Sequence, residues 1–167
     1  MNIKERPRIK LKLTSIGRII EIINWISVLA IWVFTIVNYN NLPDIIPTHF
    51  NFAGEVDGFG GKANVLIFPI IATIFFVGLT ILNRYPHIFN YPTKITEENA
   101  LRQYTYATKM IRYLNLILIV NFGFLSFSTV QNANGQADGI GIWYLPVSLG
   151  LVYIIIIYTI LKLTKKS

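Results

Sequence analysis

The side chains best suited to chemistry are concentrated in one short stretch, residues 42–62. It contains one imidazole, three carboxylates, one carboxamide and one amine, namely His49, Asp44, Glu55, Asp57, Asn51 and Lys62. A histidine titrates near neutrality and a carboxylate can orient its ring, so His49 and Asp57 could form an acid–base pair. With a further carboxylate they would also supply the donor atoms of a metal site. Thr48 is the only hydroxyl in the stretch, so no obvious nucleophile accompanies the pair.

The backbone of this stretch is constrained by its composition. It carries two prolines and four glycines, namely Pro43, Pro47, Gly54, Gly58, Gly60 and Gly61. Proline restricts the chain to extended and turn conformations, and glycine permits positive φ or close backbone approach. We therefore predict a compact, irregular loop whose polar side chains satisfy backbone groups and whose three phenylalanines pack on the ends of helices. A rigid loop of this kind suits the binding of a partner or ligand.

The predicted binding surface comprises eight loop residues with distinctive chemistry or backbone requirements: Pro43, Pro47, His49, Asn51, Gly54, Asp57, Gly60 and Lys62. No catalytic residue and no metal ligand is assigned, because one histidine with scattered carboxylates is a weak signal. The chain also contains no phosphate-binding glycine loop, no zinc-protease motif and no nucleophile elbow. We therefore expect no cofactor, and an enzyme is the less favoured interpretation.

The composition indicates a membrane protein. Of the 167 residues, 53% are hydrophobic and only 14% are charged, whereas soluble domains carry about 25% charged residues. The apolar residues form four long runs, each sufficient for a helix that crosses a bilayer. The predicted fold is an all-α integral membrane protein, a four-helix bundle with a structured extracytoplasmic loop between the first two helices. We treat residues 1–167 as a single membrane domain, with spans at 17–39, 63–82, 108–130 and 142–161 and the loop at 40–62.

Several polar residues and prolines predict details of these helices. Thr14 and Ser15 can cap the first span, and Thr96 can start a long third helix that continues to residue 130. Pro69 lies inside the second predicted span, where a missing backbone donor would kink the helix.

Polar residues within the spans predict contacts. Glu21 is expected to pair with Arg18 one turn earlier, or to extend its carboxylate to the interface. Asn115 and Asn121 are expected to make hydrogen bonds between helices.

The distribution of Lys and Arg predicts the topology. Six lie in the N-terminal flank, residues 1–18, one lies in the first loop, five lie in the second loop and early third helix, none lies in the third loop, and three follow the fourth span. Lys and Arg favour the cytoplasmic flanks of membrane helices. We therefore predict a protein of the inner or plasma membrane with both termini in the cytoplasm. The loop at 40–62 would then lie outside. The net charge of +7 belongs to these flanks and does not predict nucleic-acid binding. The chain has no cysteine, so disulfides are excluded.

The loop carries a motif with fixed spacing: Leu42-Pro43-x-x-Ile46-Pro47-x-His49-Phe50-Asn51-x-x-Gly54-x-x-Asp57-x-x-Gly60-x-Lys62. It resembles the signature of a bacterial membrane-protein family of unknown function, which is shared with SdpI-type immunity proteins. The resemblance implies an integral membrane protein with this loop outside the cytoplasm, and it implies no established catalytic residues.

Three classes of function remain after these observations. The favoured one is a binding, immunity or signalling protein whose outer loop recognises a peptide toxin or an envelope component, with a regulator as an inner partner. The second is a membrane enzyme or metal-dependent protein that uses His49 and Asp57. The third is a small transporter subunit, suggested by the proline-containing spans. The lipid bilayer is an expected partner in each case, and the transporter would require an oligomer.

Overall fold

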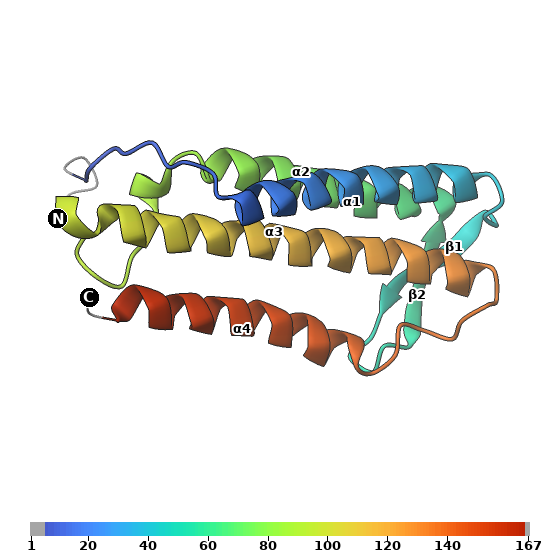
Figure 1. Ribbon diagram of the computed structural model, residues 1–167. Helices are drawn as coiled ribbons and strands as arrows, with labels where there is room; N and C mark the ends of the chain where they lie inside the picture. The colour runs from blue at the N-terminus through green and yellow to red at the C-terminus, as the bar shows by residue number, and fades with distance from the viewer. Residues whose placement is uncertain (1–5, 166–167) are drawn as a thin grey trace.

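The computed structural model describes residues 6–165, which are built around four long helices (Figure 1). In chain order the elements are α1 (Ser15–Tyr39), β1 (Ile45–Phe50), β2 (Val56–Gly61), η2 (Lys62–Leu66), α2 (Ile67–Leu82), η3 (Pro86–Ile88), α3 (Glu97–Ala133) and α4 (Tyr144–Thr164). The elements η2 and η3 are short 3-10 helices. The prediction of a mainly helical protein with four helices long and apolar enough to cross a membrane is confirmed for the described residues.

Two helices begin at the predicted capping residues. The hydroxyl of Thr14 accepts a hydrogen bond from the N–H of Gly17 at 3.1 Å. At the start of α3, the hydroxyl of Thr96 accepts from the N–H of Asn99, and the carboxamide oxygen of Asn99 accepts from the N–H of Thr96 at 2.9 Å. These bonds satisfy amide groups that the first turn of a helix leaves unpaired, so they define where α1 and α3 begin.

The prolines of α2 and α4 lie in first turns. α2 begins at Ile67, directly after η2, and Pro69 follows two residues later. α4 begins at Tyr144, and Pro146 occupies the equivalent position. A proline in the first turn removes no intrahelical hydrogen bond, because those N–H groups have no partner within the helix. Pro69 therefore does not interrupt the interior of a helix as predicted, and the backbone conformation changes before the proline, from η2 to α2.

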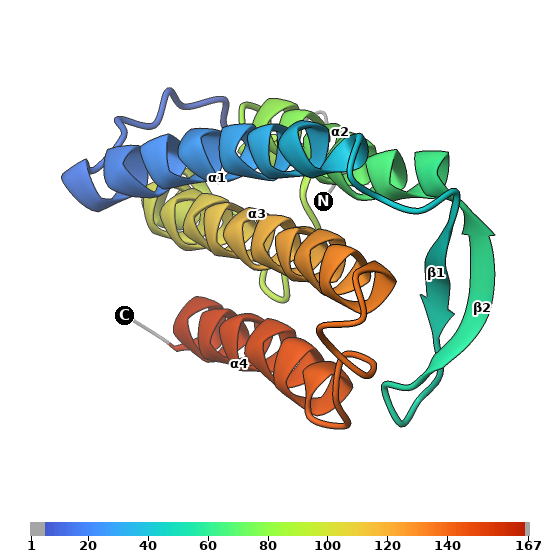
Figure 2. The same cartoon turned by 90° about the vertical axis from the view of Figure 1, so that its right-hand side faces the viewer.

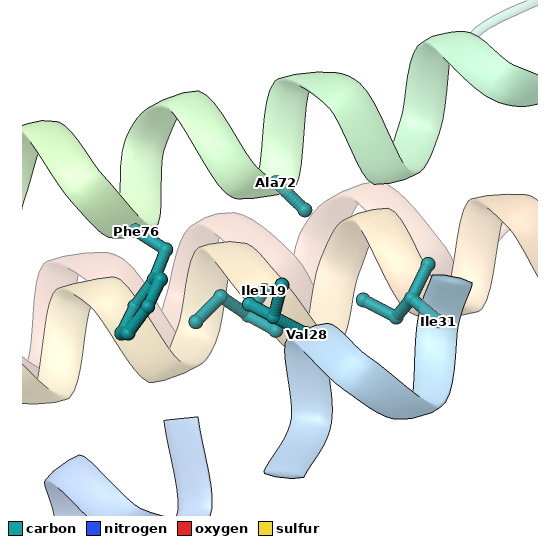
Figure 3. Packing of buried hydrophobic residues seen from close by; sticks show 5 residues of the cluster. All are labelled: Val28, Ile31, Ala72, Phe76 and Ile119. Atoms are coloured by element: carbon teal, nitrogen blue, oxygen red, sulfur yellow. The ribbon is translucent and has the colours of Figure 1, made fainter. Parts of the chain in front are cut away.

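The central helix of the bundle is α3, against which α1, α2 and α4 all pack. α1 also packs on α2, whereas the substantial helix contacts of α4 are with α3 (Figures 1 and 2). A cluster of buried apolar side chains joins α1, α2 and α3, as Figure 3 shows for Val28, Ile31, Ala72, Phe76 and Ile119. The outer faces of all four helices remain apolar and exposed, as expected of helices that face lipid.

Polar contacts hold α1 and α3 in one register. The Nε–H of Arg112 donates to Oε1 of Glu21 at 2.9 Å, and the hydroxyls of Thr35 and Ser126 lie 2.9 Å apart. Both pairs are separated by 91 residues in sequence, so the two helices run in the same direction side by side. The predicted pairing of Glu21 with Arg18 is therefore wrong, because the carboxylate turns to a neighbouring helix instead.

The predicted hydrogen bonds between helices from two asparagines are confirmed. The carboxamide of Asn115 donates to the carbonyl oxygen of Phe76 in α2 at 3.3 Å. The carboxamide oxygen of Asn121 accepts from the hydroxyl of Ser148 in α4. These bonds join α3 to α2 and to α4, where few charged groups are present.

The two ends of the bundle differ in charge. One end gathers the N-terminal segment, the loop around η3, the start of α3 and the end of α4, as the bonds from Tyr104 to Pro7 and from Gln103 to Leu163 show. Apart from Lys62, every described Lys and Arg belongs to this end, in residues 6–18, 84–112 and 162–165. Lys4 and Lys166 of the predicted basic flanks lie outside the described residues.

Candidate functional site

The loop between α1 and α2 contains an antiparallel hairpin that extends past the end of α3 toward the start of α4 (Figure 2). Its register pairs Ile46 with Gly60 and Pro47 with Phe59, and it is irregular on both sides of His49. The prediction of irregular backbone missed these strands. Proline and glycine are tolerated here because a hairpin has open edges and because bulges accommodate local irregularity.

The turn of the hairpin is organised by Asn51. Its carboxamide oxygen accepts from the N–H groups of Ala53 and Glu55 at 2.9 and 3.0 Å. Its amide nitrogen donates to the carboxylate of Glu55 at 2.9 Å. Backbone bonds from Asn51 to Glu55 and from Gly54 to Asn51 complete the turn. Asn51 therefore has the framework role that the sequence suggested, as the side chain around which the turn closes.

The tip of the hairpin is clasped by the loop between α3 and α4. The N–H of Ile140 donates to the carbonyl oxygen of Gly54 at 2.7 Å. A Cβ atom on Gly54 would lie 2.5 Å from the carbonyl oxygen of Gly141, and one on Gly139 would meet the carbonyl of Gly54. All three glycines have positive φ, between 80° and 83°. We call Gly54, Gly139, Ile140 and Gly141 the clasp, and its close backbone contact requires glycine.

The other side of the clasp is anchored to α3. The carboxamide of Asn132, in the last turn of α3, donates to the carbonyl oxygen of Gly139 at 2.9 Å and accepts from the N–H of the same residue. The side chain of Asn132 therefore forms hydrogen bonds with both the N–H and the carbonyl oxygen of Gly139. As a result the hairpin tip is fixed to the bundle at a point far along the chain from its own strands.

The base of the hairpin is held by a polar contact above an apolar cluster. The amine of Lys62 lies 3.3 Å from the carboxylate of Asp44, and the N–H of Lys62 donates to the carbonyl oxygen of Asp44 at 2.9 Å. The amine also lies 5.8 Å from the centre of the Tyr39 ring. Beneath this contact, buried side chains connect the loop to α3: Leu42, Ile46, Val65 and Val130. The Asp44 side chain is exposed to solvent, which weakens the ion pair. Burial of the apolar cluster therefore contributes most of the stabilisation of the hairpin base.

His49 and Asp57 are brought together across the two strands. Nδ1 of His49 lies 2.5 Å from Oδ1 of Asp57, and the two side chains are 71% and 42% exposed. Gly58 lies opposite His49 in the register, and a Cβ atom there would lie 2.9 Å from Cβ of His49. A glycine at this position therefore lets β2 lie close to the Cβ atom of His49.

A third metal ligand is not brought to this pair. Glu55 is bonded to Asn51 and Asp44 faces Lys62. Within residues 6–165, no three His, Asp or Glu side chains converge. The pair is thus arranged for a hydrogen bond or a proton exchange at the surface, and the donors for a metal cage are spread along the hairpin.

The remaining predicted site residues have backbone roles. Pro43 is exposed between α1 and β1, and Pro47 is buried within β1 opposite Phe59. A Cβ atom on Gly60 would lie 2.9 Å from the carboxamide of Asn64 and 3.0 Å from the methyl of Thr48. Gly60 therefore permits β2 to pass close to the start of η2.

Two of the three loop phenylalanines are exposed instead of packed on helix ends. Phe52 in the turn is 91% exposed and Phe59 in β2 is 68% exposed, whereas Phe50 is half-buried. Trp143, which follows the clasp, is 74% exposed. The prediction that these phenylalanines pack on the bundle is wrong for Phe52 and Phe59, because the hairpin extends beyond the helices and turns these rings outward.

The two strands of the hairpin differ in their surroundings. β1 packs on β2, on α3 and on η2, whereas the substantial contacts of β2 are with β1. Within the described chain, no additional strand pairs with the outer edge of β2. The sequence did not indicate this edge or the clasp, although the three glycines at 135–141 were a signal that the second loop has special backbone requirements.

Comparison with known proteins places this hairpin in a wider context. Residues 26–73, which run from the middle of α1 through the hairpin into α2, match the profile of a domain of unknown function, DUF1648. An uncharacterized protein of Archaeoglobus fulgidus is 31% identical over 173 residues, covering 96% of this chain and 87% of that protein. The chain belongs to the same family of unknown function as this relative. No solved structure matches it.

The range matched by DUF1648 includes all eight predicted site residues, from Pro43 to Lys62. The clasp partners at residues 139–141, by contrast, lie outside that range and within the alignment to the archaeal relative. The hairpin within the matched range and the second loop together form one end of the bundle.

Proposed function

We propose that this protein is a multi-pass membrane protein that recognises an extended peptide segment outside the cytoplasm, through the open edge of β2. The observation that carries the proposal is a hairpin fixed at its tip and base. The outer edge of β2 is neither paired with a strand of the described chain nor in substantial contact with a helix, and the rings of Phe52 and Phe59 on the hairpin are exposed. Extended peptides commonly bind to such edges, where the backbone bonds supply affinity and side chains supply specificity.

Membrane insertion and orientation are supported by the helices and the charges. Four helices are long and apolar enough to cross a bilayer. Positive charges concentrate at the end opposite the hairpin, and such ends favour the cytoplasm. We therefore propose that the hairpin and the clasp lie outside, and that the described ends of the chain lie in the cytoplasm.

The rigidity of the hairpin supports recognition. The clasp, the Asn51 turn and the Asp44–Lys62 contact hold the strands before any partner arrives. A preorganised edge loses less conformational entropy on binding than a flexible loop. Gly61 in β2 fits the same role, because its Cβ position has no neighbour closer than 4.0 Å and another backbone can approach there.

The occupant we propose is a secreted peptide or an exposed segment of an envelope component. The resemblance of the loop motif to SdpI-type immunity proteins favours a peptide toxin. His49 and Asp57 form a polar pair on the hairpin, and Phe52 and Phe59 add apolar contact area. Aromatic anchors beside a polar pair are typical of recognition surfaces.

Peptide selection tests this proposal directly. The protein in lipid nanodiscs is used to select random peptides displayed on phage. We expect enrichment of extended sequences, and at least a tenfold loss of their binding in the double variant Phe52→Ala/Phe59→Ala. Tyr153→Ala serves as the matched control, because it removes an aromatic ring that is 61% exposed on α4. No enrichment over empty nanodiscs, or equal binding by the hairpin variant, contradicts the proposal.

A second candidate function is surface acid–base or metal chemistry at His49 and Asp57. The 2.5 Å contact between Nδ1 of His49 and Oδ1 of Asp57 favours the acid–base form, whereas a metal would need a further ligand that the described residues do not bring to the pair. Metal content of the purified protein, measured with and without His49→Ala, distinguishes the two. Stoichiometric metal that disappears in the variant would favour this second function over peptide recognition alone.

A further inference from the structure

At the end opposite the hairpin, a cavity of about 440 Å³ opens between the N-terminal segment, α1, the end of α2 and α3. Its charged lining consists of Lys10, Arg84, Arg112 and Glu21. Three cations and one carboxylate leave the lining with a formal charge of +2 (3 − 1). The cavity shares no residue with the hairpin, and it is unconnected with peptide recognition there.

The carboxylate does not neutralise the cations equally. Glu21 accepts from the Nε–H of Arg112 at 2.9 Å, and the two terminal amino groups of that guanidinium are further donors. The Arg112 side chain is mostly buried by its neighbours. Lys10 and Arg84 are exposed at the mouth. The arrangement therefore combines one guanidinium held in place by Glu21 with two adjustable cations, which suits an anion with several oxygen atoms.

Apolar side chains line the same cavity. Ile9, Leu11 and Leu13 come from the N-terminal segment and border the charged groups. This segment is held to the bundle by Arg6, whose guanidinium donates to the carbonyl oxygens of His87 and Phe89 at 3.0 and 2.6 Å. The cavity is thus lined by both charged and apolar side chains, and the N-terminal segment that contributes the apolar ones is held in place by Arg6.

We propose that this cavity binds the phosphate group of an anionic phospholipid, with its acyl chains following the apolar wall toward the bilayer. Basic pockets between membrane helices on the cytoplasmic side are sites of this type. A neighbouring cavity is also basic, with Lys12 and Lys109 in its lining, and Arg112 lines both cavities. The apolar wall favours a lipid over a free phosphate ion. The inference rests on the membrane insertion proposed above, and it is independent of what the hairpin binds.

The test is a titration of the purified protein in neutral-detergent micelles with fluorescent phosphatidylglycerol. Fluorescent phosphatidylcholine and inorganic phosphate are the comparison arms. We expect phosphatidylglycerol to bind at least tenfold more tightly than phosphatidylcholine, and inorganic phosphate to compete only weakly. Loss of each cation should weaken binding about fivefold, so Lys10→Ala/Arg84→Ala should weaken it by more than tenfold.

Two variants keep the result interpretable. Arg8→Ala/Arg18→Ala removes the same charge from exposed positions outside the cavity lining, and it should bind almost normally. Lys10→Arg/Arg84→Lys keeps the charges and should restore binding. Equal losses in both alanine variants indicate a general charge effect and overturn the proposal, as does inorganic phosphate that competes as strongly as the lipid. Recovery of the protein in the membrane fraction and selection of peptides by the hairpin are measured separately, so failure here is distinguishable from failure of the proposed function.

Discussion

The position of the hairpin tip depends on Gly54. Its φ is +82°, and a Cβ atom would lie 2.5 Å from the backbone oxygen of Gly141. Both features disfavour any other residue, since a side chain is strained at positive φ and the neighbouring atom is backbone that cannot rotate away.

We predict that Gly54→Ala destabilises the folded protein by about 2 kcal/mol or more, because backbone strain and a steric clash add. The measurement is the free energy of unfolding in detergent. Gly135→Ala is the matched control, because Gly135 also has positive φ, +68°, but no atom lies within 4 Å of its Cβ position. A loss for Gly54→Ala no larger than for the control would mean that the clasp contributes nothing to stability.

Tyr91 illustrates a second kind of residue effect, one that depends on pH. Its hydroxyl donates to the carbonyl oxygen of Pro86 at 2.9 Å. The pKa of Tyr91 is raised mainly by burial and to a smaller extent by the neighbouring phenol of Tyr104, whereas the cation of Arg6 lowers it. The folded state therefore holds this proton more tightly than the unfolded chain. The resulting stabilisation is complete below the ordinary pKa of about 10 and is lost as the pH rises through the folded pKa.

We predict that the stability of the wild type falls more steeply between pH 9 and pH 11 than that of Tyr91→Phe, which has no proton to lose. Unfolding midpoints measured across this range in one detergent provide the comparison. Parallel curves for the two proteins would show that the phenol ionises equally in the folded and unfolded states.

Residue roles were only partly predictable from the sequence. Thr14 and Thr96 were predictable, because a capping residue acts on the backbone next to it. The partner of Glu21 was not, because Arg112 is 91 residues away and reaches it only after α1 and α3 pack. The exposure of Phe52 was missed for a related reason, since an apolar residue gives no sign that its element extends beyond the core.

At the scale of elements, the helices were predictable and the hairpin was not. Four apolar runs of sufficient length predict four helices without any knowledge of their packing. The strands lack the alternation that marks a half-buried strand, because β2 contains three glycines and β1 contains Pro47. Their conformation depends on tertiary contacts with α3, η2 and the clasp, which no local pattern records.

The parallel register of α1 and α3 carries a prediction of its own. The hydroxyls of Thr35 and Ser126 are fully buried and lie 2.9 Å apart. A double-mutant cycle with Thr35→Ala and Ser126→Ala should give a coupling energy of about 0.6 kcal/mol, the usual size for hydrogen bonds between membrane helices. Thr159 bonds within α4, so a cycle between Thr159→Ala and Ser126→Ala should give no coupling. Equal coupling in both cycles would mean that the hydroxyl pair does not specify the register.

The whole molecule is polarised between two ends with different chemistry. One end presents the clasped hairpin with its open edge, and the other presents the basic cavity around Arg112. The helices between them are long and apolar enough to separate two aqueous compartments. In this account the hairpin meets peptides outside while the basic end contacts anionic lipid inside, and both roles depend on the same orientation.

The most direct test of this orientation is thiol labelling in intact cells, which the absence of native cysteine permits. Ala53→Cys places one thiol in the exposed turn of the hairpin, and Glu98→Cys places one in the exposed first turn of α3 at the basic end. With a membrane-impermeant maleimide, we predict that Ala53→Cys is modified in intact cells and that Glu98→Cys is modified only after permeabilisation. Modification of Glu98→Cys in intact cells, with Ala53→Cys protected, would contradict an outer recognition hairpin.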